Sequence, residues 1–363
     1  MRERADVVTP WRPARRRRPG GEGGVGLHTR GSTGVPTSVI ILVLAALCVL
    51  LCLTSLAIGS RSLTLGELAS AFTPGKRSVA SIIVWQLRMP RTALAVMVGS
   101  SLAVAGVVMQ GLTRNPLAEP GILGVNAGAS LAVVLSMSLL GLTDASGFLW
   151  FAFAGAAVAA FLVHLMARRS ADAGPARLVL AGVALGASLR SITGTVTMYD
   201  SVTFDSYRFW VLGSLADRDA GLLVWVVPFL VAGLVLALAS GLTLNALALG
   251  EEQAKALGVS PGRARALALT SIALLCGAST AAVGPISFIG LVVPHVLRLA
   301  LGADQRKLLA VSVVAGPVLL LTADILGRVI LESGEMEAGV VTSFIGGPVL
   351  LLMVIQRMGV SGQ

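Results

Sequence analysis

Long apolar runs, separated by short polar intervals, fill the chain from about residue 38 to residue 356. A helix that crosses a bilayer needs about 20 mostly apolar residues. By this criterion the candidate spans are 38–58, 91–111, 121–141, 148–167, 178–198, 221–241, 265–283, 286–301, 308–330 and 338–356. The run 286–301 is short for a complete crossing. The pattern predicts an all-α, polytopic membrane protein with about ten transmembrane helices.

One polar interval carries a pattern of its own. Residues 244–265 read LNALALGEEQAKALGVSPGRAR, in which apolar and small residues recur at helical spacing. The residues on this side are Leu247, Gly250, Ala254, Leu257 and Gly258, and the opposite side carries Glu251, Glu252 and Lys255. The pattern predicts a short amphipathic helix outside the membrane. An ATP-hydrolysing partner that docks there and an ordinary interfacial loop helix are equal alternatives on spacing alone.

Composition and charge support the membrane assignment and predict an orientation. Hydrophobic residues make up 55% of the chain and charged residues 13%, against about 25% charged residues in an average soluble domain. Residues 1–37 hold eight basic and three acidic residues, a local net charge of +5. Basic residues hold flanking segments in the cytoplasm, so with an even number of spans we expect both termini to be cytoplasmic. The tail, rich in glycine and proline, is predicted to be disordered, and residues 38–358 form the membrane domain.

The candidate chemistry excludes several classes of protein. No GxxxxGK[ST] nucleotide-binding loop occurs, and the three histidines and three cysteines show no metal-ligand spacing. A secondary transporter that works without ATP would need titratable pairs deep inside its spans, and away from the span ends the only charged residues are Asp324 and Arg190. We therefore expect no enzymatic activity, no bound cofactor and no metal site in this chain, and an energy source outside it.

Three arginines break the orientation rule because they lie at the predicted outer ends of spans. Arg88 and Arg91 belong to WQLRMPR, and Arg328 closes ADILGR. These side chains could reach lipid phosphates, since long basic side chains extend toward the interface. They could instead anchor an acidic partner that arrives from outside, because the planar guanidinium pairs with carboxylates through two hydrogen bonds. Asp324 is expected to pair with Arg328 at i, i+4 spacing.

Eight strings in order carry a family resemblance. They are LRMPR (87–91), MQGLTRNPLAEPGILGVNAGAS (109–130), LVLAGVALG (178–186), YRFWVLGSL (207–215), LALGEEQAKALGV (247–259), GPISFIGLVVPHVLRL (284–299), ADILGR (323–328) and GVVTSFIGGPVL (339–350). Together they resemble the FecCD family, the permease subunits of binding-protein-dependent ABC importers for ferric siderophores, heme and cobalamin. The resemblance covers about residues 38–357 and is nearest to the ferric-enterobactin-type permeases. Met336-Glu337-Ala338-Gly339 departs from the family's usual Leu-Pro-Val-Gly.

The resemblance implies a function and a set of partners. The chain would be the permease subunit of an ATP-driven importer of ferric siderophores in the bacterial plasma (inner) membrane. Cobalamin or heme import by a permease of the same family is the alternative. The implied partners are a second, non-identical permease, two copies of an ABC ATPase that holds ATP and Mg, and a periplasmic or lipid-anchored substrate-binding protein. Membrane lipids surround the chain, and no nucleic acid is expected.

The resemblance also assigns roles to residues. The ATPase-coupling residues would be Ala248, Gly250, Glu251, Glu252, Ala254, Leu257 and Gly258. The residues that dock the binding protein would be Arg88, Arg91 and Arg328. The inner gate would comprise Asn115, Leu117, Pro175 and Ala176, where Pro175 replaces a hydroxyl residue of the related permease.

Overall fold

The computed structural model describes residues 36–59, 63–73, 78–142, 145–168, 175–218, 220–331 and 334–361. The predicted disordered tail therefore lies outside the described residues, apart from its last two positions. All regular structure in the described part of the chain is helical, as the apolar pattern predicted.

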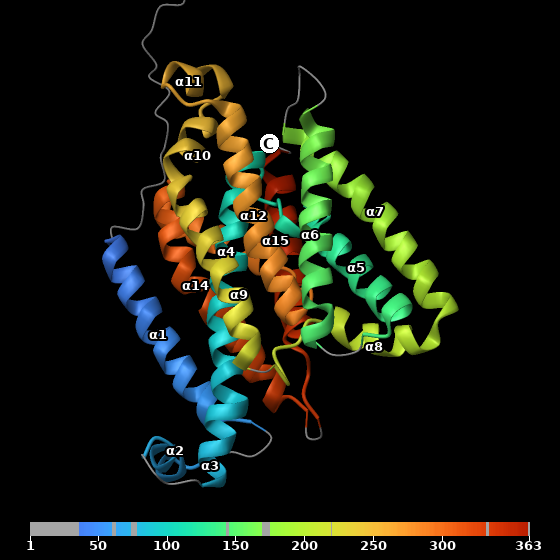
Figure 1. Cartoon of the computed structure of the whole chain (residues 1–363). Coiled ribbons are helices and arrows are strands. Elements are labelled where there is room, and N and C mark those ends of the chain that lie inside the picture. The colour runs from blue at the N-terminus through green and yellow to red at the C-terminus, as the bar shows by residue number, and fades with distance from the viewer. Residues whose placement is uncertain are drawn as a thin grey trace, which may run out of the picture. The chain divides into compact units, whose positions relative to one another are not determined.

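The helices follow one another with short connections (Figure 1). They are α1 (Thr37–Ala57), α2 (Leu65–Ala71), α3 (Val79–Ile82), the π-helix η1 (Ile83–Arg88), α4 (Met89–Thr113), the 3₁₀-helix η2 (Pro120–Leu123), α5 (Val125–Leu140), α6 (Ala145–Arg168), α7 (Pro175–Tyr199), α8 (Ser201–Val211), α9 (Ala220–Ala239), α10 (Gly241–Ala248), α11 (Glu251–Ala256), α12 (Pro261–Val283), α13 (Ile289–Leu301), α14 (Gln305–Val329) and α15 (Ala338–Ser361).

Within the described residues, eight helical segments are long and apolar enough to cross a membrane. Two shorter apolar helices, α5 and α13, account for the remaining predicted spans. The prediction that 286–301 is short for a crossing is confirmed, whereas 121–141 proves equally short, because residues before Val125 turn as a 3₁₀-helix. The second span is longer than predicted, since α3, η1 and α4 form one continuous segment, Val79–Thr113.

Helix α4 is the centre of the bundle. It packs against α14, α12, α13 and α9, and nearly all of its residues from Leu94 onward are buried. Its closest crossings use glycine on both sides: Gly99 faces Gly316 of α14, and Gly106 faces Gly290 of α13. A methyl group at any of these four positions would overlap the backbone opposite. Such crossings suit membrane helices, because small residues let backbones approach where lipid supplies no hydrophobic drive.

The bundle has two distinct ends (Figure 1). Helices α10 and α11 lie at one, here called the α11 end, and α2 and α3 lie at the other, the α2 end. Helix α14 begins close to α10 and runs without interruption for 25 residues to Val329, whose turn packs near α1 and α4. One helix thus joins the two ends.

A half-buried carboxylate connects the segments that precede the two short helices, α5 and α13. Glu119, just before η2, accepts a hydrogen bond from the backbone N–H of Phe288 at 2.6 Å. Phe288 has φ +71°, a conformation that costs a bulky residue free energy and needs support from its surroundings. Its side chain packs against Gly346 of α15, where no larger residue would fit. The segments before α5 and α13 are therefore held together inside the bundle.

Candidate functional sites at the two ends of α14

The predicted amphipathic stretch forms two short helices that meet at an angle, and not a single helix. Helix α10 ends at Ala248 and α11 begins at Glu251, with Gly250 between them at φ +122°. Only glycine adopts such a backbone angle without strain, so the single predicted helix is wrong at this position. We call residues 246–259 the α10–α11 corner. Its small core consists of Ala246, Leu247, Ala254 and Ala264, with Val259 against it.

The apolar side of this corner differs from the side predicted by spacing. Ala254 is fully buried, but Leu257 is 63% exposed, because the chain turns after Ala256. Of the predicted coupling residues, Ala248, Glu252, Leu257 and Gly258 are exposed, and Gly250 and Glu251 are half-buried. Leu249, which the sequence did not single out, is 65% exposed. Two leucines therefore project at the α11 end, uncovered by the part of the chain that the structure describes.

Glu251 has a partner within the chain. Its carboxylate pairs with Arg265 on α12 and so fixes the start of α11 against the start of α12. Glu252 remains exposed. The two glutamates, predicted as equivalent, thus have different surroundings.

Asn245 ties α10 to the beginning of α14. Its Nδ2 donates to Asp304 Oδ1 at 2.9 Å, and its Oδ1 accepts from the backbone N–H of Gln305 at 2.9 Å. Asp304 also caps α14 through the N–H of Arg306. The hydrogen bond from Asn245 holds the pKa of Asp304 below its usual value, against the opposing effect of burial. These hydrogen bonds therefore tie α10 to the first turn of α14.

At the other end of α14, one buried carboxylate serves two arginines. Asp324 is 1% exposed and accepts from Arg91 Nε at 3.0 Å and Nη2 at 2.8 Å. It also pairs with Arg328, one turn further along α14, as the i, i+4 spacing predicted. Arg91 reaches Glu335 as well, with Nη1 2.6 Å from Oε2.

The three arginines make most of their contacts inside the bundle. Arg88 donates to the carbonyls of Leu56 and Ala57 at 2.7 and 2.8 Å, and Arg328 donates to that of Ser55 at 2.8 Å. These contacts fix the last turn of α1 and bring together arginines that lie more than two hundred residues apart in the sequence. The side chains of Arg88 and Arg328 do not reach toward lipid phosphates, because each residue is only 6% exposed. Their role in docking stays a prediction.

A cavity of about 590 Å³ opens beside this cluster. Arg88, Arg91 and Arg328 line it together with Arg218, Asp217 and Glu335. Arg218 was missed in the sequence because it follows an irregular segment with no helical pattern. Burial lowers the pKa of Arg218, while the charges of Glu337 and Asp217 act in the opposite direction. Four guanidinium groups thus surround a hollow with fewer carboxylates, a setting suited to an acidic side chain.

The π-helix that places Arg88 has a cause in the sequence. Pro90 lacks an N–H and its ring crowds the carbonyl one turn earlier, so the regular helix cannot continue through residues 86–90. The chain widens into η1 and accommodates the proline. This rotates Arg88 into the interior toward the end of α1, where its two carbonyl acceptors lie.

The predicted gate residues lie on two elements. Asn115 Oδ1 accepts from the N–H of Leu117 at 3.0 Å, which makes a tight turn after α4. Leu117 packs beside Phe288, Leu291 and Met353. Ala176 is exposed at the start of α7, which begins at Pro175. The gate assignment stays a prediction. Glu119, two residues after Leu117, accepts a hydrogen bond from the backbone N–H of Phe288, a contact that the sequence did not indicate.

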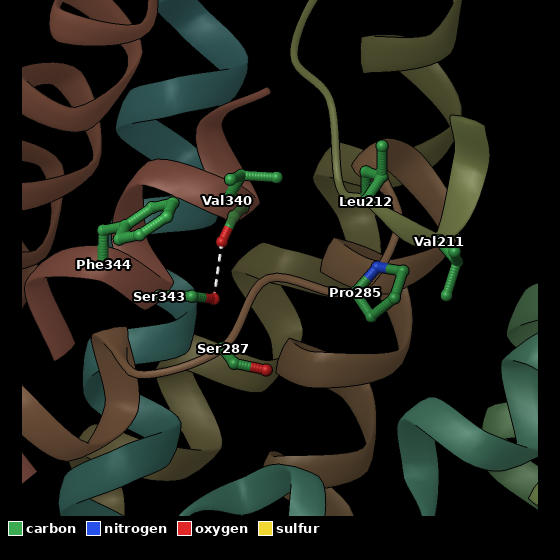
Figure 2. A pocket seen from close by; sticks show the side chains of 8 residues that line it. Val211, Leu212, Pro285, Ser287, Val340, Ser343 and Phe344 are labelled. Atoms are coloured by element: carbon green, nitrogen blue, oxygen red, sulfur yellow. Dashed lines mark hydrogen bonds between the residues drawn. The ribbon is translucent and has the colours of Figure 1, made fainter. Parts of the chain in front are cut away.

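A second cavity, of about 430 Å³, lies between α15 and the segments that precede α9 and α13. Figure 2 shows Val340, Ser343 and Phe344 on one side, Val211, Leu212 and Pro285 on the other, and Ser287 between them. Phe344, on the membrane-length helix α15, is 72% exposed. The hydroxyl of Ser343 donates to the carbonyl of Gly339 on its own helix at 2.8 Å. The lining is weakly polar and carries no charge.

The described residues contain no group of three or more histidine, cysteine, aspartate or glutamate side chains that could hold a metal ion.

Comparison with known proteins identifies the relatives of this arrangement. The FecCD transport family matches residues 47–356. The ferric enterobactin transport system permease of Escherichia coli (strain K12) is 44% identical, over 90% of this chain and 98% of its own length. The hemin transport system permease of Yersinia pestis is 37% identical over 85% of this chain and 94% of its own. A vitamin B12 import system permease of Vibrio cholerae is 41% identical over 81% of this chain and 89% of its own.

A solved structure has the same fold. It is described as a metal-chelate type ABC transporter in an inward-facing conformation, and it superposes with a TM-score of 0.79 at 28% identity. The match covers 88% of this chain and 99% of the other.

Proposed function

Because the chain belongs to the FecCD transport family, as a multi-pass inner-membrane permease of metal-chelate ABC importers, we propose that it carries ferric siderophores and is driven by a separate ATPase through the α10–α11 corner. In this proposal the α11 end lies in the cytoplasm and the α2 end faces outward. The functional unit contains this chain, a second and non-identical permease, two ATPase copies and a substrate-binding protein.

The observation that carries the proposal is the connection of both candidate sites to α14. Asn245 fixes α10 to the start of this helix, and Asp324 and Arg328 stand near its end. A helix of 25 residues spans roughly 37 Å at 1.5 Å per residue, enough to cross the hydrocarbon core. A push on the corner would thus reach the arginine cluster and the helices packed on α14.

The corner suits an ATPase as partner. Leu249 and Leu257 are exposed at the end of the bundle, and a partner that covers them would remove their apolar surface from water. Glu252 and Lys255 flank them and supply the polar rim that protein interfaces show. The small core of the corner includes Ala264 of α12, and Glu251 pairs with Arg265 of the same helix, so a push on the corner would also reach α12.

The arginine cavity suits a binding protein. A carboxylate that enters it would meet Arg88, Arg91 or Arg218, while Asp324 pairs with Arg91 and Arg328 and offsets part of the buried positive charge. The arginines therefore hold their geometry before the partner arrives, which lowers the cost of docking.

A siderophore surrounds its iron with organic groups. The translocation path therefore needs a complementary, weakly polar surface more than it needs metal ligands. The cavity of Figure 2, with apolar groups and two serines, has this character. ATP binding and hydrolysis would switch the permease pair between outward-open and inward-open states, each favoured by a different nucleotide state of the ATPase. Heme or cobalamin import by the same architecture remains the second candidate, since relatives of comparable identity import them.

The corner can be tested with two leucines of equal exposure. Leu257→Ala removes about three carbon groups from the proposed interface, worth about 2 kcal/mol or roughly a thirtyfold loss of ATPase affinity. Leu242→Ala is the control, because Leu242 is also 63% exposed but precedes the corner. We expect Leu257→Ala to lose co-purifying ATPase and iron uptake and Leu242→Ala to keep both. Equal behaviour of the two variants would contradict coupling through the corner.

A further inference from the structure

Helix α7 turns a long face away from the rest of the chain. One side packs against α5, α6 and η2, and the other is uncovered over the whole helix (Figure 1). Residues on the free side include Leu180 and Met198, 69% and 85% exposed. Among the eight long helices, α7 has the lowest mean hydropathy.

An arginine stands on this uncovered face. Arg190 is exposed, and its side chain makes no hydrogen bond or ion pair with any other described residue. This distinguishes it from Arg91 and Arg328, which Asp324 neutralises.

The charge of Arg190 stays near the middle of the helix. Its Cα lies roughly 22 Å along the axis from Pro175 and roughly 13 Å from Tyr199, at 1.5 Å per residue. The guanidinium folds back from the nearer end, with Nη1 3.5 Å and Nη2 3.7 Å from the point where a Cβ of Gly186 would stand. The side chain therefore does not extend toward the membrane surface.

Lipid is a poor neighbour for this group. An arginine at the bilayer centre is unfavourable on every insertion scale, because lipid offers its charge no partner. The cost disappears where water or an anion meets the guanidinium, so this part of α7 faces an aqueous path or a charged partner.

The surroundings of Arg190 leave room for a bulky ligand. Glycines stand one turn before and one turn after it, and a methyl group at Gly194 would meet nothing within 4 Å. Gly124, at the start of α5, is the nearest backbone beyond Gly186, with its Cα 3.7 Å from the same point. The guanidinium thus lies where the buried Gly186 meets the start of α5, and the open position at Gly194 lies one turn further along α7.

We propose that Arg190 binds the anionic oxygens of the metal chelate as it crosses the membrane and so selects chelates of net negative charge. The inference rests on the proposed transport function and adds the charge class of the cargo. Oxygen atoms of catecholate or carboxylate groups at the rim of the chelate would accept two parallel hydrogen bonds from the guanidinium. The exposed side chain of Arg190 and the open position at Gly194 fit a passing ligand, and a permanent carboxylate of the second permease is the alternative that the test separates.

The test uses the complete importer, with both permeases, the ATPase and the binding protein, in proteoliposomes. Uptake of radioactive iron is measured as a ferric tris-catecholate, which is anionic, and as a ferric tris-hydroxamate, which is neutral. Losing one charge-assisted contact of about 1.5–3 kcal/mol corresponds to about 10- to 150-fold. We expect Arg190→Gln to lose at least about tenfold in tris-catecholate uptake and in preference over the neutral chelate.

Arg190→Lys should retain more uptake than Arg190→Gln, since it keeps the charge but loses the fork. Arg177→Gln, on the same helix but 13 positions earlier, is the matched control and should behave as wild type. Wild-type uptake by Arg190→Gln would overturn the inference and leave the proposed function standing. A complex that falls apart with Arg190→Gln and reassembles with Arg190→Lys would also overturn it, in favour of an ion pair with the second permease. No uptake of either chelate by the wild-type importer would refute the siderophore function itself, and the inference with it.

Discussion

Replacing Asp324 with asparagine removes one charge from the centre of the arginine cluster and keeps the size of the side chain. Asp324 is 1% exposed and holds Arg91 through hydrogen bonds of 2.8 and 3.0 Å, together with Arg328. In the variant, Arg328 would keep only neutral partners, the carbonyls of Ser55 and Ile58 and the hydroxyl of Ser55. Arg91 would keep Glu335, whose side chain is 30% exposed.

The expected loss follows from this burial. Removing one partner of a buried ion pair costs about 3–5 kcal/mol, because the remaining charge is left without compensation. Glu335→Gln is the matched control, since it removes a carboxylate from the same arginine at a partly exposed position, where an ion pair is worth about 0.2–1 kcal/mol. At about 2 °C per kcal/mol for a large domain, Asp324→Asn should lower the unfolding midpoint by about 6–10 °C and Glu335→Gln by no more than about 2 °C.

The assay is the thermal midpoint of the purified permease complex in detergent, read from the fraction that remains monodisperse after heating. Shifts of the same size in Asp324→Asn and Glu335→Gln would refute the reasoning, because burial would then make no difference to the cluster.

Two further predictions concern coupling and packing. Asn245→Ala removes both 2.9 Å hydrogen bonds between α10 and the start of α14. The ATPase should still co-purify, while the iron imported per ATP hydrolysed should fall several-fold. An unchanged ratio in proteoliposomes would contradict transmission through Asn245. Gly106→Ala places a methyl group into the carbonyl of Gly290 and should lower the unfolding midpoint by several degrees. The added methyl group of Gly347→Ala meets nothing within 4 Å, so this variant should keep the wild-type midpoint. Equal midpoints for the two variants would show that α4 and α13 separate at no cost in free energy.

The apolar pattern predicted the helices well, because lipid demands a helix wherever about 20 apolar residues occur in sequence. It located the span ends less well. The start of α4 lies within a continuous segment from Val79, since residues 79–90 are apolar enough to continue the helix despite Pro90. The short length of α5 was also missed, because glycine and proline in 116–124 favour a 3₁₀ turn that hydropathy does not register.

The sites were predictable only where the contacts are local. Asp324 and Arg328 lie one helical turn apart, so their pairing followed from spacing. Arg91 reaches the same carboxylate from 233 positions away, and no local pattern indicates that contact. Likewise, the spacing that placed Leu257 on the buried side of one helix could not register the break at Gly250, with its φ of +122°, or the turn after Ala256. Glu119 and Phe288 meet through tertiary packing alone.

The most direct test of the account is uptake by proteoliposomes that contain the two permeases, with and without the ATPase. Binding protein loaded with ferric siderophore is added on the side that the α2 end faces. The account predicts accumulation of iron against its gradient only when the ATPase and ATP are both present, and none when Leu257→Ala prevents the ATPase from docking. Accumulation by the permeases alone would contradict it, because the chain would then draw on an energy source other than its contact with the ATPase.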